Sequence, residues 1–118
     1  MSMNRKERRA AAKQERSGGK AASAGQVAKI EKAIGLAQVG DLAGAEALLD
    51  PISRTDPDLP ELNHQLGMIY VRTGRAEPGL QLLRKAVAIR PEESLYWNNL
   101  GAACLAIERS QEAVDAVR

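Results

Sequence analysis

The chain has 118 residues and a formal net charge of +2, and hydrophobic residues make up 44% of it. No apolar run approaches the roughly 18 residues that a membrane-spanning helix needs, and the basic start lacks the apolar stretch of a secretory signal. The single cysteine, Cys104, excludes an intramolecular disulfide. These features predict a cytoplasmic protein with one domain, whose core is aliphatic because phenylalanine is absent.

Residues 1–25 are predicted to form a basic flexible arm. They contain seven basic and two acidic residues, a net charge of +5, which leaves −3 for residues 26–118. The glycine, serine and alanine that follow the charged part are typical of a flexible tether. Residues 5–20 could contact nucleic acid or an anionic membrane by charge alone, but they contain no aromatic side chain and no apolar face. A solvated tail is therefore the favoured interpretation.

Beyond the arm, the sequence repeats itself every 34 residues. Gly40 and Gly74 are one repeat apart, and so are Pro57 and Pro91. A period of this length indicates stacked helix pairs, none of which can bury its apolar face alone. We therefore predict an all-α fold, an α-α superhelix (solenoid) of antiparallel helix pairs, whose function lies on a surface.

Turn residues and apolar spacing predict where the helices begin and end. Apolar residues recur at spacings of three and four, glycine closes the first helix of each pair, and proline separates the pairs. The predicted helices are 26–38, 42–55, 60–73, 77–89, 94–107 and a last one from residue 110. They form the repeats 26–59, 60–93 and 94–118, of which the last is truncated.

Proline and glycine inside these helices carry further expectations. Pro51 lies inside the second helix, where it removes one hydrogen bond, and we expect a kink there. Gly67 and Gly101 fall in mid-helix, where glycine is less favourable than alanine by roughly 0.8–1.0 kcal/mol. Close approach of a paired helix would explain both glycines, so a bulky residue at either position is predicted to be destabilising.

Two stretches resemble the tetratricopeptide repeat family. Each differs by one residue from its signature Trp-x-x-Leu-Gly-x-x-Tyr, namely Asn63-x-x-Leu66-Gly67-x-x-Tyr70 and Trp97-x-x-Leu100-Gly101-x-x-Cys104. The resemblance covers residues 26–118 and is weakest in the first repeat, where lysines replace residues of the signature.

The resemblance implies a non-catalytic module that binds a peptide or a partner helix. Members of the family generally bind such ligands along the concave face made by the first helix of each pair. Residues 3–10 are also similar to the start of some bacterial family members that carry a glycosyltransferase or other transferase domain. The alternative hypothesis is therefore a substrate-recruiting region at the N-terminus of a larger bacterial enzyme.

The resemblance also implies which positions face the groove. They lie on one face of the three first helices, and they are Val27, Ile30, Ile34, Glu61, His64, Met68, Arg72, Leu95, Asn98, Ala102 and Leu105.

The residue types at these positions indicate the chemistry of the partner. Ile30 and Ile34 occupy the first helix, where a carboxylate clamp for chaperone tails would need lysine or asparagine. An apolar groove with a few polar groups suits an amphipathic helix or a hydrophobic peptide instead. The competing interpretation is that the array or the N-terminal arm covers some of these residues.

Candidate catalytic and metal-binding residues are scarce. His64 is the single histidine, and no cysteine lies at metal-ligand spacing from it. Cys104 falls at a repeat position filled elsewhere by Leu36 and Tyr70, which indicates a core residue. We predict no enzymatic activity, metal or cofactor for this chain.

The last predicted helix contains apolar residues that lack a following helix. Ala113, Val114 and Val117 belong to it, whereas solenoids normally finish with a polar capping element. We expect either that the chain is part of a longer protein or that it self-associates through this end.

Overall fold

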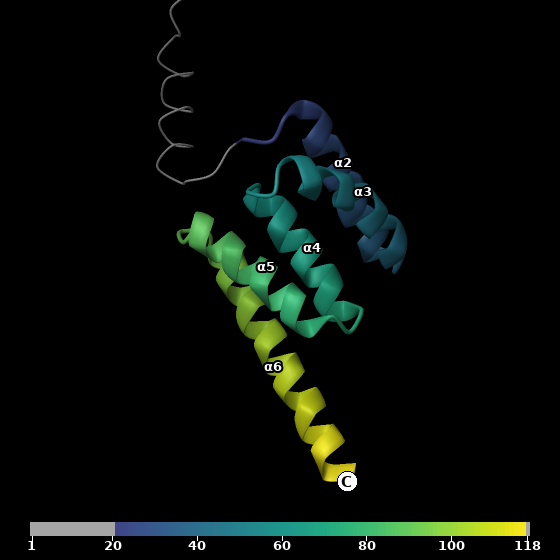
Figure 1. The fold of residues 1–118 in the computed structure, drawn as a ribbon, viewed down its shortest axis with the longest axis vertical. Coiled ribbons are helices and arrows are strands. Elements are labelled where there is room, and N and C mark those ends of the chain that lie inside the picture. The colour runs from purple at the N-terminus through teal and green to yellow at the C-terminus, as the bar shows by residue number, and fades with distance from the viewer. Residues whose placement is uncertain (1–20, 118) are drawn as a thin grey trace, which may run out of the picture.

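The structure is a computed structural model that describes residues 21–117 of the chain. The described part consists of helices without strands: α2 (Ala24–Gln38), α3 (Leu42–Thr55), α4 (Pro60–Arg72), α5 (Ala76–Ile89) and α6 (Ser94–Val117). Helices α2 and α3 form one pair, α4 and α5 form the next, and α6 packs on the second pair (Figure 1). The predicted all-α solenoid is confirmed. Residues 1–20 of the predicted arm lie outside the described residues.

The turn inside each pair has the same construction in both repeats. Gly40 and Gly74 have φ angles of +90° and +86°, values that residues with a Cβ atom rarely adopt. The backbone amide of the next residue then donates back into the preceding helix, from Asp41 to the carbonyl of Leu36 at 2.9 Å and from Arg75 to that of Tyr70 at 2.8 Å. The prediction that these glycines close the first helices is confirmed.

A capping box starts the first helix two residues before its predicted start. The side-chain oxygen of Ser23 accepts from the backbone amide of Gln26 at 3.2 Å, and Gln26 Oε1 accepts from the amide of Ser23 at 2.9 Å. Both bonds satisfy amides that the helix itself leaves without partners.

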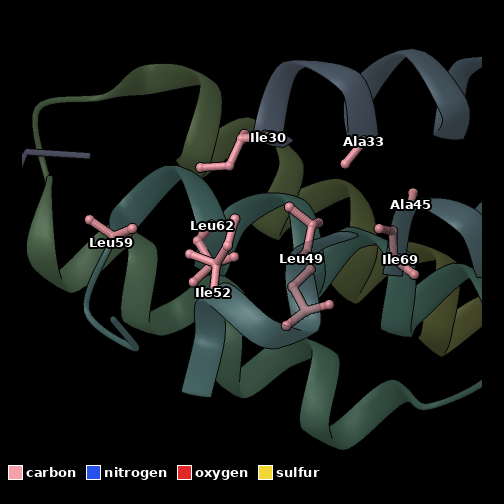
Figure 2. Packing of buried hydrophobic residues seen from close by; sticks show 9 residues of the cluster. Ile30, Ala33, Ala45, Leu49, Ile52, Leu59, Leu62 and Ile69 are labelled. Atoms are coloured by element: carbon pink, nitrogen blue, oxygen red, sulfur yellow. The ribbon is translucent and has the colours of Figure 1, made fainter. Parts of the chain in front are cut away.

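The core follows the helix pairs as a chain of aliphatic clusters. Side chains of α2, α3 and α4 point toward one another in the first cluster (Figure 2), which contains Ile30, Ala33, Ala45, Leu49, Ile52, Leu59, Leu62, Leu66 and Ile69. Smaller clusters join α5 to α6 through Leu80, Leu83 and Ala103 and through Ala86, Val87 and Tyr96. The core therefore extends along the solenoid without closing into a globule.

The close approach predicted at Gly67 is confirmed. A methyl group added there would lie 2.9 Å from the carbonyl oxygen of Gly79 and 3.0 Å from the Cγ atom of Leu83. Both of these atoms belong to α5, so Gly67 and Gly79 allow the backbones of α4 and α5 to approach each other.

The prediction of two short helices at residues 94–107 and from residue 110 is wrong. Helix α6 continues without a break from Ser94 to Val117. The reason is that Glu108 stands one repeat after Gly74, where a left-handed glycine would be needed to close the helix. Glutamate is instead a good helix former, so the chain does not turn back.

The unbroken helix leaves Gly101 without the contact predicted for it. A methyl group added at Gly101 would meet no atom within 4 Å, because none of the helices at residues 21–117 covers this side of α6. The expectation of close packing at Gly101 is therefore wrong. Helix α3 runs unbroken through Pro51, and a kink there stays a prediction.

Candidate functional site

The first helices of the pairs lie next to one another along the solenoid. Helix α4 contacts both α2 and α6, so the outward sides of these three helices adjoin one another and form one surface. We call this surface the first-helix face. All the groove positions predicted from the sequence lie on these three helices.

The predicted positions differ in exposure. The exposed ones are Val27, Arg72, Leu95, Asn98, Ala102 and Leu105, the half-buried ones are Ile34, Glu61 and Met68, and the buried ones are Ile30 and His64. The exposed fractions of the apolar Val27, Leu95 and Leu105 are 41%, 52% and 47%. A ligand could therefore contact apolar surface at both ends of the face.

A hollow brings together three of the predicted positions. It has a volume of about 300 Å³ and lies where α2 and α4 begin, next to the end of α5. Its walls are formed by Ala21, Ala22, Val27, Ile30, Leu59, Pro60, Glu61 and Arg90. Arg90 was not among the predicted positions, because it follows the second helix of its pair.

Polar groups that are buried or half-buried join α4 to α6. The imidazole Nε2 atom of His64 lies 2.7 Å from Asn99 Nδ2, and its ring lies 4.7 Å from the ring of Tyr96 between centroids. The Tyr96 hydroxyl donates to a carboxylate oxygen of Glu61 at 2.9 Å. His64 thus joins α4 to α6, and a contact of this residue with a ligand stays a prediction.

Burial also controls the protonation of these groups. It lowers the pKa of His64, although the negative charges of Glu61 and Glu93 oppose the effect. Burial and the neighbouring Glu61 raise the pKa of Tyr96 well above its usual value. His64 is therefore neutral at pH 7, which suits a ring packed against Tyr96.

Sequence reasoning missed Tyr96 and Asn99 as partners of this network. Tyr96 stands one repeat after Leu62, so its register indicated only a core residue. The polar pairs 61 with 96 and 64 with 99 are both separated by 35 residues, one more than the period. This offset was the only signal in the sequence for contacts between adjacent first helices.

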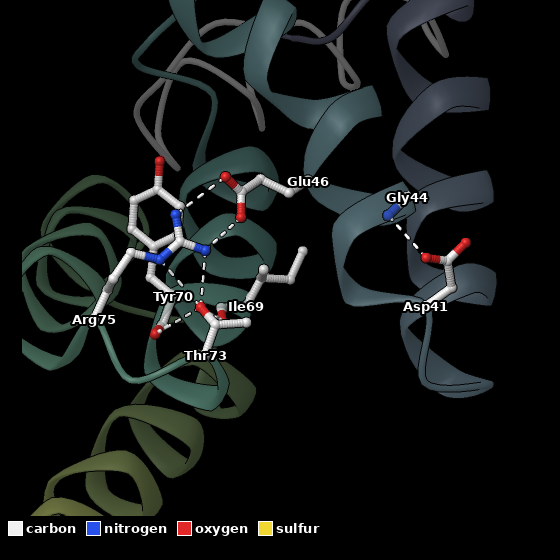
Figure 3. A network of polar contacts seen from close by, with 7 residues as sticks. All are labelled: Asp41, Gly44, Glu46, Ile69, Tyr70, Thr73 and Arg75. Atoms are coloured by element: carbon white, nitrogen blue, oxygen red, sulfur yellow. Dashed lines mark hydrogen bonds and ion pairs between the residues drawn. The ribbon is translucent and has the colours of Figure 1, made fainter.

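A second polar network lies at the junction of the two pairs (Figure 3). The Arg75 guanidinium group donates to both carboxylate oxygens of Glu46 on α3 and lies 4.2 Å from the centre of the Tyr70 ring. A hydrogen bond from Arg75 lowers the pKa of Glu46. Because both side chains are partly exposed, we expect this ion pair to connect the two helix pairs but to contribute only modestly to the free energy of unfolding.

Metal-ligating side chains do not cluster in the part of the chain that the structure describes. Within residues 21–117, no group of three histidine, cysteine, aspartate or glutamate side chains could hold a metal ion. Cys104 packs half-buried against Leu80, Leu83 and Ala103, which confirms the core position predicted for it. No helix in this part of the chain is long and apolar enough to cross a membrane.

Comparison with known proteins agrees with the repeat architecture. A sequence profile of the tetratricopeptide repeat matches residues 36–104. A TPR repeat-containing protein of Pseudomonas aeruginosa is 36% identical over 78 residues, which cover 64% of this chain and 30% of that protein.

Peroxisomal targeting signal receptors of two fungi are also similar. The receptor of Candida albicans is 35% identical over 51 residues, and that of Eremothecium gossypii is 32% identical over 57 residues. The alignments cover 43% and 48% of this chain but only 9% and 10% of the receptors. The chain thus spans less than a third of the length of each of these relatives.

Proposed function

Because the chain belongs to the tetratricopeptide repeat family, we propose that it is a non-catalytic module that binds a protein partner on the first-helix face. The ligand is an extended peptide or an amphipathic helix of that partner. One observation carries this proposal. Among the described residues, the large apolar side chains that are exposed within helices belong to α2 and α6, and α3, α4 and α5 expose none.

The residues between these exposed side chains continue the apolar surface. Ile34 and Met68 are half-buried at the register position that Ala102 occupies on α6. Apolar residues at one register position on three adjacent helices favour an apolar ligand over the acidic tail of a chaperone. The names of the fungal relatives describe receptors for a targeting signal, and we carry over only recognition of a segment of another protein.

The module is proposed to act within a larger protein or assembly. This part of the proposal is supported by the relatives, because the chain spans only a small fraction of the length of each one. An alternative form of this proposal is that the larger protein carries a transferase domain after the repeats. Self-association through the C-terminal end is a further proposal, supported by Val114, which is 50% exposed.

A display experiment followed by mapping tests this function. Peptides are selected from a random library on the immobilised full-length chain, and the strongest binder is titrated into the isotope-labelled chain. We expect saturable amide shifts at Val27, Met68, Leu95 and Ala102. The proposal fails if the library yields no binder, or if the shifts occur instead on α3 and α5.

A further inference from the structure

The second half of α6 is exposed along its whole length. Residues 108–116 are all exposed, and this part of the helix extends beyond the ends of α4 and α5 (Figure 1). A helical segment this short is only marginally stable in water without a packing partner. These residues, which we call the free half of α6, are therefore a surface on which another segment could pack.

One side of the free half is acidic. Glu108, Glu112 and Asp115 are separated by four and three residues, a spacing that places them on the same side of a helix. Asp115 accepts a hydrogen bond from Gln111 at 3.1 Å. Among the described residues, none of the three carboxylates forms an ion pair. Because like charges at these spacings repel each other, the helix is more stable when cations lie beside them.

Acidic charge sets α6 apart from the other described helices. It contains three acidic residues and one basic residue, a net charge of −2, whereas α2, α3, α4 and α5 carry net charges from −1 to +1. Contact surfaces between protein segments are generally complementary in charge. A segment that packs on the free half is therefore expected to be basic.

The N-terminal arm of the same chain has the required charge and spacing. Residues 1–20, which lie outside the described residues, contain seven basic and two acidic residues. In a helical conformation, Lys6, Arg9 and Lys13 would lie on one side at spacings of three and four residues. The carboxylates of α6 follow one another at spacings of four and three, so the two patterns match when the helices run antiparallel.

The arm is also long enough to reach the free half. Ala21, which follows residues 1–20, lines a hollow together with Arg90, and Arg90 lies four residues before the start of α6 at Ser94. The rise of α6 from Ser94 to Glu108 is about 21 Å. Lys13 precedes Ala21 by eight residues, which span up to about 26 Å when extended.

We propose that residues 5–16 of the arm bind as a helix, antiparallel to α6, on the free half of α6 in the same chain. The contacts are three ion pairs, namely Lys13 with Glu108, Arg9 with Glu112 and Lys6 with Asp115. The docked arm gives the free half the packing partner that it lacks among residues 21–117. None of these residues belongs to the proposed ligand site, so the inference does not depend on the proposed function.

Three effects favour this docking. A single exposed ion pair contributes little to stability, but pairs that form a network contribute more. Residues 5–16 consist entirely of alanine, arginine, lysine, glutamine and glutamate, which are good helix formers. Attachment to the same chain raises the effective concentration of the arm at this surface, which favours the contact over one with a second copy.

Zero-length cross-linking of the full chain tests the contact directly. A carbodiimide joins a lysine amine to a carboxylate where the two groups lie side by side, and mass spectrometry identifies the linked residues. We expect links from Lys13 to Glu108 and from Lys6 to Asp115. In a mixture of isotope-labelled and unlabelled chains, the masses of these links should show that both residues belong to one chain.

NMR of the isotope-labelled full chain follows the arm without a cross-link. We expect helical carbon shifts at residues 5–16 in low salt. These shifts should be lost in about 1 M salt, where the Debye length is only about 3 Å.

Charge variants of both surfaces identify the contact. Glu108→Lys combined with Glu112→Lys should abolish the link to Asp115 and the helical shifts, because like charges then face each other. Adding Arg9→Glu and Lys13→Glu should restore both signals by exchanging the charges of the two surfaces. Circular dichroism checks that each variant keeps its helices.

A matched control changes the net charge elsewhere. Glu31→Lys combined with Glu77→Lys makes the same change at exposed positions of α2 and α5, and it should leave the contact intact. Absence of the two links, or coil shifts at residues 5–16 of the parent chain in low salt, would overturn the proposal. So would links found only between two chains, or a link to Asp115 that survives the charge reversal at residues 108 and 112.

Discussion

Gly67 and Gly101 occupy the same register position but have opposite surroundings. Gly67 touches the backbone of α5, whereas Gly101 faces open space because α6 does not turn back. The sequence alone assigns both glycines to a helix contact, since the signature is the same around each. The function of a residue in a repeat thus depends on whether the next helix is present beside it.

We predict that alanine at these two positions has opposite effects. Gly67→Ala introduces a methyl group into an occupied space and should lower the free energy of unfolding by about 1–3 kcal/mol. Gly101→Ala adds no contact, and it should raise that free energy by up to about 1 kcal/mol because alanine favours the helix. Urea unfolding of the two variants measures both changes. Equal destabilisation would show that Gly101 is also covered.

His64 makes stability depend on pH. Burial lowers its pKa in the folded chain below the ordinary value of 6.5 that applies to the unfolded chain. The unfolded chain therefore binds the proton more readily. The contribution of His64 to the free energy of unfolding is fully present above pH 6.5 and is lost as the pH falls below that value.

We predict that His64→Gln removes this dependence. The free energy of unfolding of the parent chain should fall between about pH 7 and pH 5.5, above the range in which most carboxylates titrate. The variant should give a flatter profile over the same range in urea titrations. A parent chain whose stability is constant or rises as the pH falls through this range would contradict the account of His64.

At the scale of elements, most helix boundaries could be predicted because short-range chemistry determines them. The glycine turns and the prolines between pairs are visible in the sequence, and α3 runs from Leu42 to Thr55 as predicted. The continuation of α6 past residue 107 was not predicted, because the 34-residue period suggested a turn there. Glu108 stands in place of the glycine that such a turn requires. Regular spacing cannot substitute for the residue that makes the turn possible.

The continuity of α6 can be measured as a distance. Positions 101 and 113 are separated by 12 residues, which corresponds to a rise of about 18 Å along a helix. Spin labels at these positions should report a single population consistent with that rise plus the label lengths. Glu108→Gly should broaden or shorten the distribution because it introduces a residue that permits a turn. A short distance in the parent chain would mean that residues 110–117 fold back.

The candidate site was less predictable than the helices. Val27, Leu95 and Leu105 are exposed on the first helices, and their contact with a ligand stays a prediction. The burial of His64 depends on Tyr96 and Asn99 from the next repeat, and Arg90 enters the hollow from the end of α5. Contacts between repeats decide these features, and no pattern within one repeat contains them.

On the scale of the whole molecule, two helix pairs and α6 support one continuous face. The Glu46–Arg75 ion pair joins the first pair to the second, and the Glu61–Tyr96 and His64–Asn99 contacts join the second pair to α6. The two contacts between α4 and α6 lie between helices that carry the face, so the fold holds the spacing of the apolar residues on these helices. Rigid spacing lowers the entropic cost of binding an extended segment.

The most direct test of the account compares two exposed positions that each acquire one negative charge. Ala102→Glu lies on the first-helix face, whereas Gln81→Glu lies on α5 and lines a second hollow, to which α3 and α4 also contribute. The dissociation constant of the display-selected peptide is measured for each variant by titration calorimetry. The account predicts that Ala102→Glu weakens binding at least about tenfold, because a charge is buried against apolar ligand surface, while Gln81→Glu changes it less than about twofold. Weakening by Gln81→Glu without an effect of Ala102→Glu would place the ligand on the second helices and contradict the account.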